Sequence, residues 1–305
     1  MSVGGRYEIL GPLGRGGMGR VYRARDVVLG REVALKLLDS HASDELAARF
    51  EREARALARL DHPGCVRVLD VARRYLVLEL VAGTTLAAAL RADGQFSQAR
   101  ALRIARGVLA ALAHAHARGV LHRDIKPDNI MLAASGRVVL IDFGLACVVD
   151  EPGLTGVGMC LGSPSYIAPE RLRAEPYDAR ADLWSVGVVL YEMLAGARPF
   201  VGPRPEDVMR MALERPPRPL RAARRDVSRG LEAVVLRALA KRADARWADA
   251  EDLRGALDEL EREPDDEPGY DGDAAGSTIT MLEVRHGLAR RVWAWLRYGK
   301  WRWST

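Results

Sequence analysis

The spacing of apolar residues predicts strands in the first part of the chain. Five short runs are rich in β-branched or aromatic residues and are bounded by turn residues, as is typical of strands. These runs are 7–12, 21–26, 31–38, 66–71 and 75–80. Only residues 72–74 separate the last two runs, so we expect them to form a hairpin. Within residues 44–60 the apolar side chains recur every three or four positions, which predicts one helix among the strands.

Helical patterns dominate the next part of the chain. The apolar stripe of residues 97–118 predicts a long helix, with Ser97 as its N-cap and Gly119 as its end. The later elements are expected to be strands at 130–132 and 138–141, a glycine-rich loop at 144–170, and mainly helices from Asp182 to Leu260. This order favours the α+β fold class, with a small β-rich lobe over residues 7–82, a larger helical lobe over residues 83–262, and a cleft between them.

The composition is that of a globular protein. Of the 305 residues 49% are hydrophobic, yet no apolar run approaches the roughly 18–20 residues that would span a bilayer. The N-terminal stretch MSVGGRYEIL lacks the basic and apolar regions of a signal peptide. The three cysteines, Cys65, Cys147 and Cys160, have no metal-ligand spacing. Together these features predict a soluble, reduced, cytoplasmic protein.

Charge is concentrated near the end of the chain. Residues 263–280 contain six acidic and no basic residues among prolines and glycines, which predicts a disordered acidic linker. Residues 281–305 contain six basic residues and one acid. The main body has no stripe of basic and aromatic residues, so the net charge of +5 does not point to nucleic acid, and no nucleic-acid partner is expected.

The tail, residues 281–305, combines a helical apolar spacing with a high tryptophan content. Apolar residues from Met281 to Trp295 recur at steps of three, four, four and three, which predicts one face of a basic amphipathic helix. Three interpretations stay open: an anchor that makes the protein peripheral at the membrane surface, a segment that binds another protein, and a helix docked on the chain's own helical lobe.

A glycine-rich stretch joins the first two predicted strands. Gly14, Gly16 and Gly19 lie between Leu13 and Val21. Glycines let a phosphate approach the backbone closely and leave N–H groups free to bind it. Taken alone, the same pattern also fits an ordinary glycine-rich hairpin.

Two charged residues strengthen the nucleotide interpretation. Lys36 ends the run VALK on the next predicted strand, from which its ammonium can reach phosphate oxygens. Glu53 lies on the following helix, where its carboxylate can pair with Lys36 and hold it in position. Either residue alone would be interpreted as a solvated surface charge, but their order after the glycines favours a phosphate site.

The most specific motifs are HRDIKPDN at residues 122–129 and DFG at residues 142–144. With them the chain resembles the protein kinase family from about Tyr7 to Leu260, and motifs such as GRGGMGRVY look most similar to bacterial members of the serine/threonine branch. The resemblance implies the bilobal protein-kinase fold. It further implies transfer of the γ-phosphate of ATP to serine or threonine hydroxyls of proteins in bacterial signalling, with autophosphorylation. The implied cofactors are ATP and Mg²⁺, with Mn²⁺ as an alternative metal.

The resemblance also implies a role for each polar residue of these motifs. Asp124 would accept or orient the proton of the attacking hydroxyl, and Lys126 would neutralise charge on the transferred phosphoryl group. Asn129 and Asp142 would hold the metal against the β- and γ-phosphates. Lys126 is also the residue that distinguishes serine/threonine kinases from most tyrosine kinases.

Further positions match the family in the nucleotide site and in the supporting structure. The residues implied around the adenine are Val21, Ala34, Leu78, Glu79, Val81 and Met131. Leu78 would be the gatekeeper, and the backbones of Glu79 and Val81 would bind the adenine edge. The implied supporting contacts are a Glu170–Arg246 pair, Asp182 bracing the catalytic loop, and a stack of Leu57, His122 and Phe143.

Regulation and assembly are less determined by the motifs. Arg123 precedes the catalytic aspartate and could bind a phosphate on the activation segment. Thr155 is the favoured phosphosite, with an inert loop residue as the alternative, and Ser163 is interpreted as structural. Some bacterial relatives dimerise through the small lobe, so a homodimer is one expectation.

Two other function classes compete with an active protein kinase. A pseudokinase scaffold would bind nucleotide or partners without catalysis, but every residue of phosphoryl transfer is present. A small-molecule phosphotransferase of kinase-like fold would lack the Ala168-Pro169-Glu170 segment that this chain contains.

Overall fold

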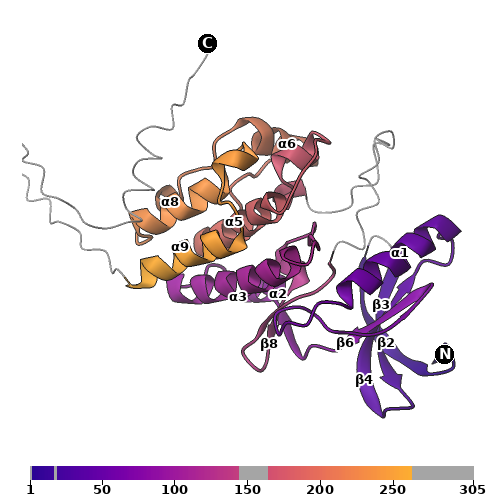
Figure 1. Cartoon of the computed structure of the whole chain (residues 1–305). Coiled ribbons are helices and arrows are strands. Elements are labelled where there is room, and N and C mark those ends of the chain that lie inside the picture. The colour runs from indigo at the N-terminus through magenta and orange to yellow at the C-terminus, as the bar shows by residue number, and fades with distance from the viewer. Residues whose placement is uncertain (1, 17–18, 144–163, 263–305) are drawn as a thin grey trace, which may run out of the picture.

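The structure, a computed structural model, describes residues 2–16, 19–143 and 164–262. Thr155, Ser163, Cys147 and Cys160 lie outside the described residues, as do the linker and the tail. The predictions made for them therefore stay predictions. The described chain forms a β-rich lobe and a helical lobe, seen at opposite ends of Figure 1.

The small lobe is a six-stranded antiparallel sheet with the strand order β1-β2-β3-β4-β6-β5. Its strands are β1 (Ser2–Val3), β2 (Tyr7–Gly16), β3 (Gly19–Asp26), β4 (Arg31–Leu38), β5 (Val68–Ala72) and β6 (Tyr75–Glu79). The predicted strands and the predicted hairpin are confirmed, although only residues 73 and 74 separate β5 from β6. Short turns join β1 through β4, and β5 to β6, so these strands pair with their neighbours in the sequence. The longer connection through α1 separates β4 from β5, and β6 lies between them.

One helix, α1 (Asp44–Leu57), covers this sheet, as the apolar spacing predicts (Figure 1). Ser43 caps its N-terminus by accepting a hydrogen bond from the Leu46 amide at 3.2 Å. The buried face of α1 consists of Ala47, Phe50, Ala54 and Leu57, spaced at three and four residues. Glu53 is next to Ala54 on this helix, so it lies at the edge of the buried face.

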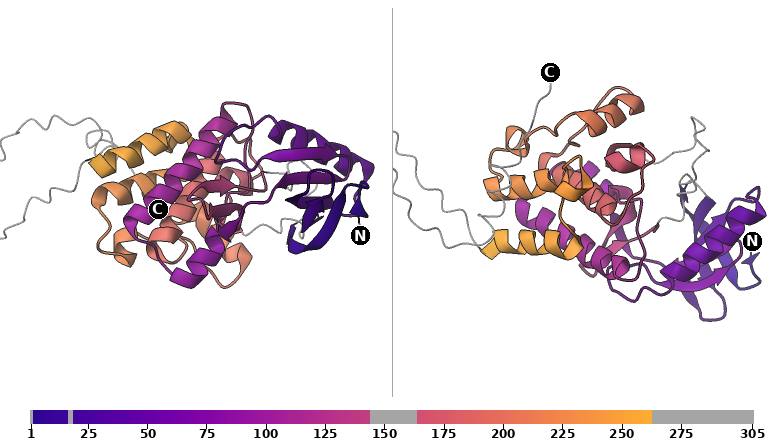
Figure 2. Two further views of the ribbon diagram at one scale, coloured as in Figure 1. Left: turned by 90° about the horizontal axis from the view of Figure 1, so that it is seen from below. Right: turned by 45° about the horizontal axis from the view of Figure 1, so that its top comes forward.

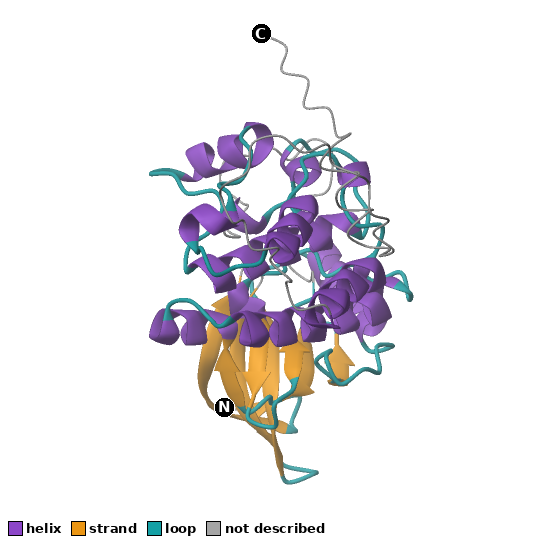
Figure 3. Ribbon diagram, turned by 90° about the vertical axis from the view of Figure 1, so that its left-hand side faces the viewer, coloured by secondary structure: helices purple, strands orange, loops and turns teal. Residues whose placement is uncertain are grey.

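The large lobe contains most of the helices, and Figure 3 shows them gathered on one side of the strands. The helices are α2 (Leu86–Asp93), α3 (Gln98–His116), α4 (Pro169–Leu172), α5 (Arg180–Ala195), α6 (Pro205–Glu214), α7 (Leu220–Ala223), α8 (Arg229–Ala238) and α9 (Ala250–Arg262). Short 3-10 turns are η1 (Pro127–Asn129), η2 (Pro164–Tyr166) and η3 (Ala243–Ala245). Ser97 caps α3, and Gly119 has φ of +71° just beyond its end, so both predicted boundaries are confirmed.

A small second sheet lies at the junction of the lobes. It has the order β7-β8-β9 and consists of β7 (Gly83–Thr85), β8 (Ile130–Ala133) and β9 (Val138–Leu140). Sequence patterns did not predict β7, because three residues are too few to show an alternation. The 164–170 part of the predicted loop also contains η2 and the start of α4. The views in Figure 2 show the two lobes joined through this region.

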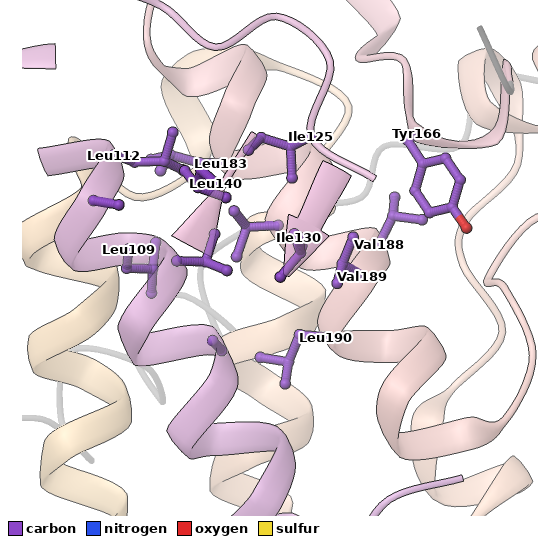
Figure 4. Packing of buried hydrophobic residues seen from close by; sticks show 14 of the residues in the cluster. Leu109, Leu112, Ile125, Ile130, Leu140, Tyr166, Leu183, Val188, Val189 and Leu190 are labelled. Atoms are coloured by element: carbon purple, nitrogen blue, oxygen red, sulfur yellow. The ribbon is translucent and has the colours of Figure 1, made fainter. Parts of the chain in front are cut away.

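The main apolar core is continuous through both lobes and contains the buried face of α1, α3 and α5. Figure 4 shows Ile125, Ile130 and Leu140 between leucines of α3 and the valines of α5. Ile125 lies within the HRDIKPDN motif, Ile130 follows it and Leu140 precedes the DFG motif; all three are at most 1% exposed. The catalytic loop is therefore anchored by its apolar neighbours on both sides. Among the described residues, no helix is both long and apolar enough to cross a membrane.

Candidate active site

The catalytic loop forms a compact polar cluster around Asp124. Lys126 Nζ donates a hydrogen bond to Asp124 Oδ2 at 2.7 Å, and Asn129 Nδ2 donates to the same oxygen at 2.8 Å. Asn129 also donates to the backbone carbonyl of Asp124 at 2.8 Å. The 3-10 turn η1 brings the three side chains together, because it folds the chain back between Lys126 and Asn129. The Asp124 side chain is 27% exposed.

Asp182, in the first turn of α5, supports this loop through hydrogen bonds to its backbone. Its carboxylate accepts the backbone N–H groups of His122 at 2.9 Å and of Arg123 at 2.8 Å. His116 Nε2 lies 2.8 Å from Asp182 Oδ2. Burial alone would raise the pKa of Asp182, but the bonds and charge of its histidine and amide partners hold it below its usual value. The prediction that Asp182 braces the catalytic loop is confirmed.

The bracing coincides with an unusual backbone conformation. Arg123 has φ of +64°, in the left-handed region that a residue with a Cβ seldom adopts. Asp182 accepts hydrogen bonds from the N–H groups of His122 and of Arg123 itself, so both bonds support the backbone where this conformation begins. The turn directs Asp124 toward Lys126 and Asn129.

Lys36 and Asp142 connect the two lobes. Lys36 Nζ donates to Asp142 Oδ1 at 2.8 Å, although 106 residues separate them in the sequence. The Lys36 side chain is only 5% exposed. Burial alone would raise the pKa of Asp142, but the charge and hydrogen bond of Lys36 lower it below its usual value. A carboxylate that stays ionised at this position can bind a cation.

The expected pair between Lys36 and Glu53 is not formed in this structure. Glu53 Oε1 lies 3.7 Å from Nη1 of Arg123, and Asp142 accepts the hydrogen bond of Lys36 instead. Burial raises the pKa of Glu53, while the positive charges of Arg123, Arg49 and Lys36 act to lower it. The expected pair is replaced for an electrostatic reason. Glu53 and Asp142 compete for the ammonium of Lys36, and the guanidinium of Arg123 offers Glu53 another cation.

Asn129 and Asp142 provide oxygen donors that fit a hard divalent cation. The backbone N–H of Ile141 donates to the Asn129 carbonyl at 3.0 Å, which holds the two segments side by side. The Asn129 amide nitrogen faces Asp124, so its amide oxygen is left for another partner. Mg²⁺ needs only one or two protein oxygens beside phosphates and water, so this donor set fits it.

The residues expected around the adenine lie on β3, β4, β6 and β8 and in the segment that follows β6. Sheet register pairs Val21 with Lys36 and Ala34 with Leu78. Ala34, Val81 and Met131 pack against the main core, in which Leu78 is 6% exposed. The Glu79 amide already donates to the Arg67 carbonyl at 2.9 Å, which leaves the Val81 amide as the donor expected for an adenine edge.

The glycine-rich stretch forms the end of β2 and the start of β3. Gly16 and Gly19 are paired across the two strands. A Cβ at Gly19 would overlap the carbonyl oxygen of Leu37 on β4, whereas a Cβ at Gly14 would meet no atom within 4 Å. Gly19 therefore has a packing requirement of its own, while Gly14 leaves open space beside Leu13, whose side chain is 50% exposed.

Two supporting contacts from the sequence analysis are confirmed. Arg246 donates to both oxygens of Glu170 at 2.7 Å, and the Arg246 side chain is 0% exposed. The ring of His122 lies 4.5 Å from that of Phe143, and both belong with Leu57 to the buried interior. These contacts fix the segments on either side of the undescribed residues 144–163.

Sequence reasoning missed two residues that support the loop. His116, near the C-terminal end of α3, lies within hydrogen-bond distance of Asp182. Arg171 on α4 donates to the Arg123 carbonyl. Neither has a local signal, because each acts on a partner more than 40 residues away.

Comparison with known proteins agrees with this geometry. The profile of the protein kinase domain matches residues 7–254. A probable serine/threonine-protein kinase of Streptomyces coelicolor is 38% identical over 297 residues, covering 93% of this chain and 43% of that protein. Serine/threonine-protein kinase PknB of Mycobacterium tuberculosis is 37% identical over 287 residues, covering 90% of this chain and 46% of that protein.

A third relative gives the same picture. Serine/threonine-protein kinase pkn2 of Myxococcus xanthus is 40% identical over 271 residues, covering 84% of this chain and 32% of that protein. The chain thus spans less than half the length of these curated relatives. By the matched profile and by these identities, the chain belongs to the protein kinase domain family.

Proposed function

We propose that this chain is a serine/threonine protein kinase that transfers the γ-phosphate of ATP to hydroxyls of protein substrates, with Mg²⁺ as its metal. The observation that carries the proposal is the joining of Lys36 and Asp142 across the lobes beside the Asp124 cluster. The names of the relatives support the serine/threonine class. A complete set of phosphoryl-transfer residues favours an enzyme over a pseudokinase scaffold.

Asp124 is the residue that would receive or orient the hydroxyl proton. Phosphoryl transfer needs an aligned nucleophile and neutralised charge more than covalent help from the protein. Asn129 donates one hydrogen bond to the Asp124 carboxylate and one to the Asp124 backbone carbonyl, which together orient the carboxylate. Lys126 lies within 2.7 Å of the same carboxylate, so its ammonium is near the hydroxyl and can also neutralise the transferred group.

Lys36, Asn129 and Asp142 would serve the nucleotide. Lys36 would position the α- and β-phosphates, and the oxygens of Asn129 and Asp142 would hold a Mg²⁺ ion. When bound, the metal neutralises charge on the β- and γ-phosphates. Mn²⁺ prefers the same oxygen donors and is the alternative metal. The Lys36–Asp142 bond keeps both side chains at the lobe interface, where the phosphates would lie.

Label transfer from γ-labelled ATP to a basic protein substrate tests the assignment. We expect label on serine and threonine after hydrolysis of the product. The Asp124→Asn variant should lose at least about 10²-fold in rate, from loss of general-base and orienting function. Asp128→Asn is the matched control, because Asp128 is an exposed acid in the same loop. Nucleotide binding with no transfer by the wild type would favour the pseudokinase alternative.

The regulatory part of the proposal concerns Arg123 and Thr155. Arg123 Nε is buried and has no hydrogen-bond partner among the described residues, so the guanidinium can take a further acceptor. A phosphate on Thr155 would supply one and compete with Glu53 for Arg123. Phosphate mapping after incubation with ATP tests this, and absence of phosphate on Thr155 in active protein contradicts it.

A further inference from the structure

Three helix ends meet at the end of the large lobe that lies far from the small lobe. Gln98 Nε2 donates to the Asp226 carbonyl at 3.1 Å, and Arg224 donates to the Phe96 carbonyl, so the loop before α8 lies against the start of α3. Leu260 of α9 lies against Gly230 of α8 so closely that a Cβ there would be 2.6 Å from it. The N-terminal ends of α3 and α8 and the C-terminal end of α9 are therefore neighbours (Figure 1).

Four arginines lie at this end and are called the basic end face here. They are Arg100, Arg103, Arg225 and Arg229. Arg103 is exposed on α3, one turn before Arg106, whose Nη2 donates to the Leu257 carbonyl at 2.6 Å. Since α3 and α9 run in opposite directions here, Arg103 lies near the level at which α9 ends. Arg229 is the first residue of α8 and directly precedes Gly230.

Three acids of this region are already paired, whereas Glu259 in the last turn of α9 has no hydrogen-bond or ion-pair partner among the described residues. Asp93 accepts from Arg100 at 2.6 Å, Asp226 accepts from Arg224 at 2.8 Å, and Asp258 lies 2.7 Å from Arg106. Within the described part of the chain, no group is hydrogen-bonded or ion-paired to the side chains of Arg103, Arg225 or Arg229. The helix starts at Ser97 and Ser228 add positive potential to that of the arginines, while the C-terminal end of α9 adds negative potential. The basic end face thus has cations without a described counter-charge.

The chain itself supplies acids at this point. Helix α9 ends at Arg262, and the next five residues contain four acids: Glu263, Asp265, Asp266 and Glu267. An extended residue spans about 3.3–3.6 Å, so these five residues reach about 17 Å from the end of α9. That reach covers the neighbouring starts of α3 and α8. Because these acids directly follow α9, their effective concentration at the basic end face is high.

We propose that residues 263–267 bind back on the basic end face, with their carboxylates beside Arg103, Arg225 and Arg229. In this arrangement the first acids of the linker lie along the surface of the large lobe and do not extend away from it. Because the pairs are exposed, each is weak and the docking depends on ionic strength. Docking would set the direction in which the chain leaves the kinase domain. It would therefore also set the side of the large lobe from which residues 281–305 extend.

Zero-length carbodiimide cross-linking of the full chain tests the docking. Arg103→Lys and Arg229→Lys keep the charge and supply amines that the reagent can join to carboxylates. We expect cross-links from both introduced amines to residues 263–267, found by mass spectrometry at about 0.1 M ionic strength, and their loss at about 1 M, where the screening length falls to about 3 Å. Arg59→Lys is the matched control, since Arg59 is exposed on the small lobe and its replacement should give none.

A second measurement does not depend on the introduced amines. The variant with Glu263→Gln, Asp265→Asn, Asp266→Asn and Glu267→Gln should show faster amide hydrogen exchange at the starts of α3 and α8 than the wild type. Unchanged exchange, or cross-links in the Arg59→Lys control as abundant as those from the basic end face, overturns the proposal. Cross-links found only between light and heavy chains in an isotope-mixed sample would assign the face to a second molecule and also overturn it.

Discussion

The ammonium of Lys36 lies 2.8 Å from a carboxylate oxygen of Asp142, although the two residues come from different lobes. Glu53, the expected partner of Lys36, lies instead 3.7 Å from Arg123. Each of these two ion pairs joins a basic residue to an acidic one, so two cations and two carboxylates meet near the lobe interface. Loss of one member is therefore expected to change the environment of the others.

Replacing Lys36 by Met should abolish most phosphoryl transfer. The variant removes the cation that lowers the pKa of Asp142 and that would contact the phosphates, so we expect a loss of about 10²–10³-fold in kcat/KM. Steady-state kinetics with labelled ATP measure it. Arg25→Met, an exposed change on β3, is the control. Equal activity of the two variants would contradict the role of Lys36.

Asp182 should act as a positioning residue. Asp182→Asn keeps the size of the side chain but removes the charge and cannot accept all three of its partners as well, so the turn at Arg123 loses support. We expect kcat to fall at least about tenfold while the KM for ATP changes little, because the nucleotide contacts lie elsewhere. Equal changes in both constants, or a mere drop in thermal stability, would show a purely structural role.

Removing one member of the buried Glu170–Arg246 ion pair should destabilise the fold strongly, because the other member is left buried without its partner. Arg246→Met leaves a carboxylate buried without its two hydrogen bonds, so the free energy of unfolding should fall by about 3–5 kcal/mol. Urea denaturation measures it. The double variant with Glu170→Leu should be destabilised by less than the sum of the single changes. Additive losses would contradict a direct interaction.

The two glycines Gly14 and Gly19 should differ in their tolerance of a methyl group. Gly19→Ala forces the backbone away from the Leu37 carbonyl, and overpacking of this kind typically costs about 1–3 kcal/mol. Gly14→Ala meets no atom within 4 Å, so the stability should change little. Thermal unfolding of both variants checks the contrast. Similar losses in the two would show that the cost comes from backbone freedom and not from the contact.

Lys241 should make the stability depend on pH. Burial, and then the charges of Arg246 and Arg173, lower the pKa of Lys241 to about 7 in the folded chain, from an ordinary 10.5. Between these values the unfolded chain binds more protons, so the free energy of unfolding should rise with pH in this range. Below pH 7 both states are protonated and the contribution is constant. Urea denaturation of wild type and Lys241→Met should give curves that diverge between pH 7 and 10; parallel curves would contradict the shifted pKa.

Local patterns account for most of the elements and for the identities of the site residues. The strands around the glycines, the capped helix α1 and the ends of α3 follow from apolar spacing, Ser43, Ser97 and Gly119. These signals are contained within a few residues, so they can be read without knowing the fold. The motif wording likewise identified Asp124, Lys126, Asn129 and Asp142 through a family resemblance, since chemistry restricts which side chains can serve there.

Only the tertiary structure decided which charges meet. Glu53 and Asp142 are both carboxylates within range of Lys36, and the sequence cannot say which one binds it, because ion pairing depends on distances set by the packing of two lobes. The same holds for His116 on Asp182 and for the arginines that gather at the basic end face from α3, α8 and the loop between α7 and α8. The sequence alone determined the chemistry available to this protein, while the fold selected the partners.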